Sequence, residues 1–207
     1  MTEQKTTQFG LLRHGKTEWN SEGRIQGSGN SPLTEEGREG VKEWIPLLKT
    51  YGWNRIIASD LGRVKQTVEI INRKLQLPVS FDPRLQEQHW GDWEGLKLST
   101  IRSEMAEELS ARIPLGWDFS APGGETRRAV NLRTKQALLE YTHRYPGEKI
   151  LIVCHQGVIK CLLYELTNRK FVPEEDALLN HNALHLLKSE EKGFSIIKLN
   201  IFQSVQT

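Results

Sequence analysis

Two short apolar runs that each lead into a histidine constrain the fold of this chain most strongly. Phe9–Leu12 is followed by Arg13 and His14, and Ile150–Val153 is followed one residue later by His155. A continuous apolar run bounded by polar residues and glycine is typical of a strand buried on both faces of a sheet. In open α/β sheets, ligands bind beyond the carboxyl ends of the strands. We therefore expect the two histidines and the arginine to share one site that binds an anion and offers a nucleophile.

The composition is that of an ordinary soluble globular protein. The chain has 207 residues, of which 37% are hydrophobic and 26% charged, which fits a single domain spanning 1–207 with room for one insertion. A formal charge of +2 is too small to favour nucleic acid or an anionic membrane as a partner. No stretch approaches the ~20 apolar residues of a spanning helix, and the first eight residues lack the apolar centre of a secretory signal. With Cys154 and Cys161 interpreted as reduced structural thiols, we expect a cytoplasmic protein.

Helical and strand patterns alternate along most of the chain, which predicts an α/β three-layer sandwich with a mainly parallel central sheet. Thr34 is the expected N-cap of the first long helix, and Ser59 or Asp60 that of the second. The expected elements are, in order, a strand at 9–12, a helix from 35 to about 51, a strand at 55–58, a helix to about 75, a helix at 125–145, a strand at 150–154, a helix through 166, and strands at 182–187 and 194–199.

The alternation is lost between residues 83 and 124, which we expect to form a small inserted cap over the crevice. This stretch contains several glycines and prolines, one weak helical segment at 98–109, and the tryptophans Trp90, Trp93 and Trp117. The simplest interpretation places the tryptophans in a core. The alternative is that they line the entrance, which would favour an apolar or aromatic leaving group.

Three strand ends lead into residues that suit an oxyanion. The first strand supplies Arg13 and His14, the second leads into Arg63 about one turn along its helix, and the last supplies His155. Adjacent strands lie ~4.8 Å apart, so these side chains can converge around one tetrahedral anion. Arginine suits phosphate because its planar fork donates two parallel hydrogen bonds, and a helix that begins near Gln156 would add backbone donors.

At this point the sequence resembles the histidine phosphatase superfamily, the phosphoglycerate mutase-like enzymes. Six segments in the family's order carry the resemblance, and together they span about residues 9–160. They are Arg13–Asn20, Gly23–Gly27 with Pro32–Gly37, Ser59–Thr67, Arg84–Glu87 with Gly91–Gly95, Pro122–Glu125, and Val153–Val158.

The resemblance implies a covalent mechanism. His14 would be the nucleophile, which takes the phosphoryl group on a ring nitrogen, and Arg13, Arg63 and His155 would neutralise the phosphoryl oxygens. Glu87 would donate a proton to the leaving oxygen and then activate water. The attacking nitrogen must be unprotonated, so the other ring nitrogen needs an acceptor such as the carbonyl of Gly15.

The resemblance also implies auxiliary substrate contacts. We expect these from Asn20, Gln26, Gly27 and Gln156, although turn and capping hydrogen bonds are the alternative for Asn20 and Gln26. No metal and no cofactor is implied.

Several neighbouring residues leave alternatives open. Glu94 and Glu125 compete with Glu87 as the proton donor. Lys16 stands where the family usually has Glu or Gln, and we expect it to be solvated rather than to alter substrate preference. His181 and His185 have the spacing of a helical metal site, but the strand pattern around them argues against one.

We therefore expect a phosphomonoester hydrolase that acts on a small phosphorylated metabolite. The alternative is a phosphoglycerate mutase-type phosphotransferase, which would use the same residues; a catalytically inactive phospho-ligand-binding module is a further alternative. The short loop between Arg24 and Pro32 and the short tail after Leu199 favour the phosphatase. We expect no nucleic acid or membrane partner. A homodimer is left open, and the motifs do not identify the substrate.

Overall fold

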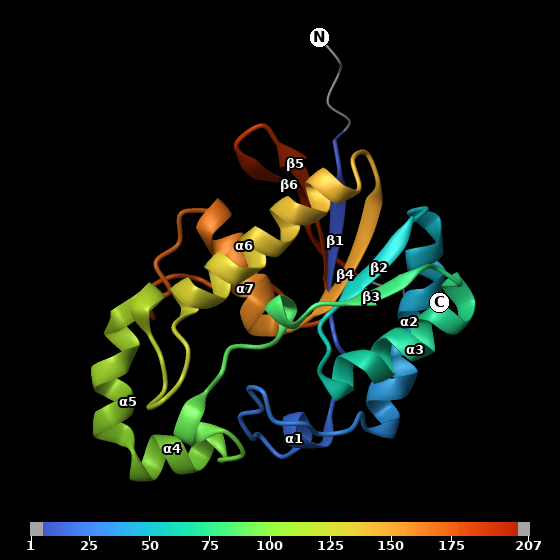
Figure 1. Cartoon of the computed structure of the whole chain (residues 1–207). Helices are drawn as coiled ribbons and strands as arrows, with labels where there is room; N and C mark the ends of the chain where they lie inside the picture. The colour runs from blue at the N-terminus through green and yellow to red at the C-terminus, as the bar shows by residue number, and fades with distance from the viewer. Residues whose placement is uncertain (1–5, 203–207) are drawn as a thin grey trace.

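A six-stranded mixed sheet forms the centre of the computed structural model, which describes residues 6–202 (Figure 1). The strands lie in the order β3-β2-β4-β1-β5-β6. The first three pairs in this order are parallel and the last two are antiparallel, so the prediction of a mainly parallel α/β sheet is confirmed. The strands are β1 Gln8–Arg13, β2 Arg55–Ala58, β3 Val79–Phe81, β4 Lys149–Cys154, β5 Leu184–Glu190 and β6 Gly193–Ile201.

Helices cover both faces of the sheet, as predicted for a three-layer arrangement. The long helices are α2 Glu35–Thr50, α3 Gly62–Leu75, α6 Arg127–Arg144 and α7 Gln156–Leu166. Apolar side chains of α2 and α3 pack in one core cluster, and those of α6 and α7 pack in another across the sheet. Within residues 6–202 no helix has both the length and the apolar character needed to cross a membrane.

The pairing of β1 with β4 places the two histidines side by side. Both strands are buried and parallel, with Leu12 opposite Val153. The ladder continues beyond β1, because the backbone N–H of His14 donates to the carbonyl of Cys154 at 3.1 Å. His14 and His155 therefore lie next to each other, just beyond the carboxyl ends of two neighbouring strands.

Three local expectations need correction. Helix α3 begins at Gly62 with Leu61 as its N-cap and no side-chain capping bond, so neither Ser59 nor Asp60 caps it and Arg63 is only its second residue. The hydroxyl of Ser59 is instead hydrogen-bonded to Nε2 of His155. The sequence pattern does not predict the short edge strand β3, because three exposed residues are too few to establish a strand period.

The cap segment, residues 83–124, lies beyond the carboxyl ends of the strands (Figure 1). The expected helix at 98–109 is interrupted at Met105, whose φ of −125° ends one helix and begins the next. Trp93 is 1% exposed and packs with Ile101 and Phe119 in a small core of this segment, which matches the simpler interpretation for that tryptophan. The elements of the segment are the 3₁₀ turns η1 Pro83–Leu85, η2 Gly91–Trp93 and η3 Ile113–Asp118, and the helices α4 Leu98–Glu104 and α5 Ala106–Arg112.

Candidate active site

The side chains of His14, His155 and Arg63 meet beyond the carboxyl ends of the central strands. The ring centroids of His14 and His155 are 5.2 Å apart. The Nε atom of Arg63, on α3, donates to Nε2 of His14 at 3.2 Å. These distances show that the three side chains lie close together, as predicted.

The hydrogen bonds of His14 fix which ring nitrogen is free to react. Nδ1 lies 2.7 Å from the carbonyl oxygen of Gly15, which only accepts, so Nδ1 carries the hydrogen. The lone pair is then on Nε2, which faces Arg63. Burial, followed by the charges of Arg13 and Arg63, holds the pKa of His14 well below its usual 6.5. His14 is therefore a neutral imidazole with its nucleophilic nitrogen directed into the site.

The second histidine presents a hydrogen-bond donor. Nε2 of His155 lies 2.8 Å from the hydroxyl of Ser59. That hydroxyl accepts from the backbone N–H of Leu61, and it has no other acceptor for its hydrogen among residues 6–202. Ser59 therefore donates to Nε2, which places the ring hydrogen on Nδ1. Burial, followed by the charge of Arg63, lowers the pKa of His155 well below its usual value, so this ring is neutral too.

Three donors of predicted site residues are buried without a hydrogen-bond partner in the described part of the chain. They are Nε of Arg13, Nδ1 of His155 and Nε2 of Gln156. A buried donor that makes no hydrogen bond costs about 1–3 kcal/mol, and groups of this kind in native proteins call for a functional explanation. An oxyanion bound beside His14 would satisfy all three. Gln26 is also buried, and its side-chain oxygen makes no hydrogen bond in this part of the chain.

Arg63 is held rigidly by a backbone loop. The side chain is 1% exposed, and its Nη1 and Nη2 atoms each donate at 2.7 Å to the carbonyls of Gly29 and Gly27. Burial lowers the pKa of Arg63 to about 10, which leaves it charged at neutral pH. Of its five N–H groups, three are engaged by His14 and the loop, so two remain for a ligand.

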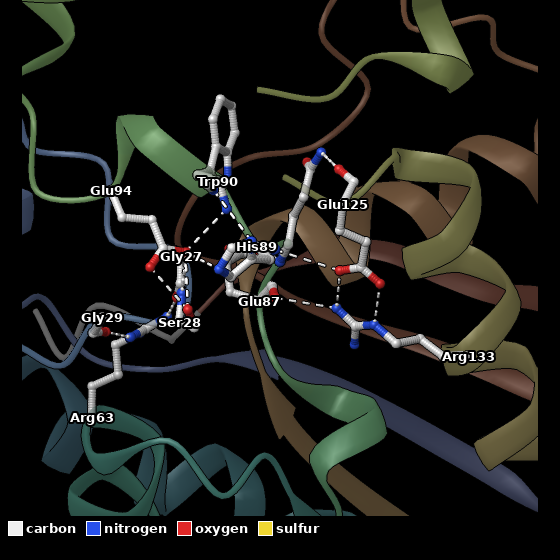
Figure 2. A network of polar contacts seen from close by, with 12 residues as sticks. Gly27, Ser28, Gly29, Arg63, Glu87, His89, Trp90, Glu94, Glu125 and Arg133 are labelled. Carbon is white, nitrogen blue, oxygen red and sulfur yellow. Dashed lines mark hydrogen bonds and ion pairs between the residues drawn. The ribbon is translucent and has the colours of Figure 1, made fainter. Parts of the chain in front are cut away.

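Glu94 anchors this loop to the cap segment (Figure 2). Its carboxylate accepts from the backbone N–H and hydroxyl of Ser28, at 2.8 and 3.0 Å, and from the backbone N–H of Trp90 at 3.0 Å. Gly27 has a φ of +51°, and a Cβ added there would lie 1.9 Å from the Glu94 carboxylate, so only glycine fits. The loop that holds Arg63 is thus fastened from the opposite side by Glu94.

The side-chain oxygens of Glu87 accept only from backbone donors and form no ion pair within residues 6–202. Its carboxylate accepts from the N–H of Gly157, at the start of α7, at 3.2 Å, and from that of Gln88 at 2.9 Å. A Cβ on Gly157 would lie 2.3 Å from Glu87, so the glycine permits this approach. Burial lowers the pKa of both Arg13 and Arg63, and the charge of Glu87 opposes that shift at each of them, so Glu87 lies near both guanidiniums.

The two competing carboxylates have other partners. Glu94 is engaged as described above, and Glu125 forms two hydrogen bonds, of 2.8 and 3.0 Å, with the guanidinium of Arg133. Arg133 also donates to the backbone carbonyl of Glu87 at 3.1 Å, so the pair supports the Glu87 backbone (Figure 2).

Two further residues singled out in the sequence have local roles: Asn20, which we expect at the site, and Lys16, which we expect to be solvated. The side-chain oxygen of Asn20 accepts from the backbone of Thr17, in the capping box of α1 (Glu18–Ser21), which is the turn-forming alternative. Lys16 forms an exposed ion pair with Glu36.

The described residues contain no group of three or more His, Cys, Asp or Glu side chains that could hold a metal. His185 is buried on β5 and its Nδ1 accepts from the backbone of Asn200, whereas His181 lies exposed before the strand.

Three residues of the site were missed by the sequence interpretation. The sequence pattern predicts a helix cap at Ser59 and an alternative proton donor at Glu94, and it assigns no role to Arg133. All three act through hydrogen bonds to residues distant in the sequence, which no local pattern reveals. Ser59 lies on the loop between β2 and Arg63, within a segment that carries the family resemblance. This position is the one feature of the sequence that points to a role for Ser59 in the site.

Known proteins are similar to this chain in sequence and in architecture. The model of the histidine phosphatase superfamily (branch 1) matches residues 9–201. The "uncharacterized phosphatase PhoE" of Bacillus subtilis is 33% identical over 88% of this chain and 89% of its own length. The "probable phosphoglycerate mutase GpmB" of Cronobacter sakazakii is 39% identical over 74% of this chain and 71% of its own length.

A solved structure agrees with the fold. The mycobacterial glucosyl-3-phosphoglycerate phosphatase in complex with VO3 superposes with a TM-score of 0.81 and 25% identity, over 94% of this chain and 99% of that one. With residues 9–201 matched by the family model, this chain belongs to branch 1 of the histidine phosphatase superfamily.

Proposed function

We propose that this protein hydrolyses small phosphomonoesters through a phosphohistidine formed on Nε2 of His14. The observation that carries the proposal is the neutral His14, whose Nδ1 is bonded to the carbonyl of Gly15 and whose Nε2 accepts from Arg63, with the ring of His155 alongside. A metal is not needed to generate the nucleophile, because the neutral ring already carries a lone pair on Nε2, which Arg63 must release for the attack.

In the first step, Nε2 of His14 attacks phosphorus in line with the leaving oxygen. The P–N bond forms as the P–O bond breaks, and the electron pair of the broken bond stays on the leaving oxygen. Glu87, in its protonated form, gives that oxygen a proton. Arg13, Arg63 and Nδ1 of His155 stabilise the charge on the three remaining oxygens, which is the main requirement of phosphoryl transfer.

In the second step, water hydrolyses the phosphohistidine. Glu87 is now ionised and takes a proton from the attacking water, which restores its protonated form and releases inorganic phosphate. His14 regains its lone pair, and Arg63 can return to it. Gln156 would contribute a further donor through its buried Nε2.

The runner-up is the mutase reaction, in which the phosphoryl group returns to another hydroxyl. The relative named a phosphatase aligns over a larger share of both chains than the relative named a mutase, which supports hydrolysis. The two reactions share their first step, so only the acceptor in the second step separates them.

Purified protein incubated with phenyl phosphate should release phosphate in the presence of EDTA. Glu87→Gln should lower kcat by roughly 10²–10⁴-fold, the usual contribution of a general acid or base. A parallel assay with 3-phosphoglycerate should show phosphate release rather than the 2-phospho isomer. Isomer formation without free phosphate would favour the mutase, and no turnover of any ester would favour the binding module.

A further inference from the structure

A buried threonine joins the backbone beside His14 to the helix that carries Arg63. Thr67 lies on α3 one turn after Arg63, so the two side chains project from the same face of the helix. The hydroxyl of Thr67 donates to the carbonyl of Arg63 at 2.8 Å and accepts from the backbone N–H of Gly15 at 3.1 Å. This one side chain therefore connects the loop that follows β1 to the start of α3.

The contacts of Thr67 close a ring of hydrogen bonds around His14. The carbonyl of Gly15 accepts from Nδ1 of His14 at 2.7 Å, and Nε2 of His14 accepts from Nε of Arg63 at 3.2 Å. Thr67 completes the ring, because it bonds to the N–H of Gly15 on one side and to the carbonyl of Arg63 on the other. Both ring nitrogens of His14 are thus held by residues that Thr67 connects.

The hydroxyl of Thr67 has no substitute in its surroundings. The residue is 0% exposed, so solvent does not reach the hydroxyl, and no other acceptor bonds to the N–H of Gly15 within residues 6–202. The single hydroxyl hydrogen goes to Arg63, which leaves the lone pairs of the oxygen for Gly15. A methyl group in place of the hydroxyl would leave this N–H facing an apolar group, which costs more than the hydrogen bond itself contributes.

The carbonyl of Gly15 lies between two anchored backbone groups. On one side the N–H of Gly15 is bonded to Thr67, and on the other side the carbonyl of Lys16 accepts from the backbone N–H of Thr34 at 3.0 Å. A Cβ at Gly15 would lie 2.6 Å from Cγ2 of Val41, so α2 packs directly against this backbone. Because hydrogen bonds are directional, the two anchors fix how the carbonyl between them is turned towards the imidazole.

We infer that Thr67 is a positioning residue, which fixes the backbone of Gly15 relative to Arg63 and thereby keeps the hydrogen of His14 on Nδ1 and the lone pair on Nε2. Its effect on rate rests on the proposed function, because the tautomer matters to turnover only if His14 accepts the phosphoryl group. Thr67 contacts no reacting atom. It bonds to the backbone of Arg63, so the guanidinium can release Nε2 for the attack while the tautomer of His14 is kept.

Thr67→Val tests the inference, because valine has nearly the shape of threonine but lacks the hydroxyl. ¹⁵N NMR of the His14 ring should show the hydrogen on Nδ1 in the wild type and a mixture of tautomers in the variant. The rate of phosphorylation of His14, measured by rapid quenching with phenyl phosphate, should fall about tenfold, the factor that corresponds to one neutral hydrogen bond. Thr67→Ser keeps the hydroxyl and should restore both the spectrum and the rate.

Thr134→Val is the matched control. Thr134 lies on α6 and is 1% exposed, and its hydroxyl donates at 2.8 Å to the carbonyl of Val130, four residues earlier, as that of Thr67 does to Arg63. Within residues 6–202 the hydroxyl of Thr134 accepts from no other group. This variant should leave the ring spectrum and the phosphorylation rate of His14 unchanged.

The ring spectrum separates failure of this inference from failure of the proposed function, because it does not depend on turnover. An unchanged His14 spectrum in Thr67→Val, or equal losses of rate in the two valine variants, would overturn the role of Thr67 alone. A tautomer that depends on Thr67 in a protein that hydrolyses no ester would overturn the phosphatase and keep that role. Hydrogen exchange of the wild type covers the case in which Thr67→Val does not fold. The N–H of Gly15 should be protected, and exchange at the rate of an unfolded chain would overturn the inference.

Discussion

In the proposed mechanism, the roles of His14 and His155 depend on one hydrogen bond at each ring. The carbonyl of Gly15 directs the lone pair of His14 to Nε2, and the hydroxyl of Ser59 directs the hydrogen of His155 to Nδ1. One ring is thereby arranged as a nucleophile and the other as a donor, although both are buried and neutral. The position of each hydrogen, rather than a difference in charge, separates their roles.

Removal of the Ser59 hydroxyl tests this assignment. Ser59→Ala should lower kcat about tenfold, because a neutral hydrogen bond contributes about 1 kcal/mol and His155 can then adopt the other tautomer. ¹⁵N NMR of the His155 ring should show the hydrogen on Nδ1 in the wild type and a mixture in the variant. Ser59→Thr keeps the hydroxyl and should restore the wild-type pattern. A wild-type ring with its hydrogen on Nε2 would contradict the assignment.

At the scale of elements, the site lies where the carboxyl end of β1, the loop 27–29 and the cap segment meet. The loop 27–29 bonds to Arg63 on one side and to Glu94 on the other (Figure 2). Glu94 is therefore a positioning residue: it contacts no reacting atom, and it acts through the carbonyls that hold Arg63 in front of His14.

Glu94→Ala should lower kcat/KM by roughly tenfold or more, because it removes Oε1, the one oxygen that accepts from the backbone N–H groups of both Ser28 and Trp90. The loss should be non-additive with Arg63→Lys, since both changes act on the same guanidinium. Asp118→Asn, which neutralises an exposed acid of the same segment, should leave activity near wild type. Additive losses in the double variant would show that Glu94 acts only on stability.

The whole molecule keeps three histidines neutral in its interior. Burial lowers the pKa of His14, His155 and His185, the last to about 4. Below pH 6.5 the unfolded chain takes up protons at these residues that the folded protein does not, so folding stability decreases as the pH falls below that value. Stability from this source is fully present above pH 6.5.

The free energy of unfolding in urea should therefore fall by about 1 kcal/mol per buried histidine between pH 7.5 and pH 5.5. His185→Gln should reduce this pH dependence by about one third, whatever its effect on absolute stability. His143→Gln, at an exposed position of α6, should leave the dependence unchanged. Equal slopes in the wild type and His185→Gln would contradict the account.

The sequence was sufficient for the framework of the molecule. The apolar runs before His14 and His155 predicted two buried neighbouring strands, and Thr34 predicted the start of α2, where its hydroxyl accepts from Gly37. These features depend on local composition and periodicity. Strand β3 and the start of α3 were missed, because an exposed edge strand and a cap without a side-chain bond leave no local signal.

The contacts that tune the site were beyond sequence reasoning. The alternative acids Glu94 and Glu125 could be set apart from Glu87 only by their partners, Ser28 and Arg133. Such pairs join residues tens of positions apart, and their geometry follows from how the cap segment packs on the rest of the chain.

The central claim is that Nε2 of His14 takes the phosphoryl group from the substrate. Rapid quenching with ³²P-labelled phenyl phosphate, followed by peptide mapping, tests it most directly. The account predicts one acid-labile, base-stable phosphopeptide that contains His14, and no label in His14→Ala. An equally labelled His14→Ala protein, or turnover of the wild type without any labelled peptide, would contradict it.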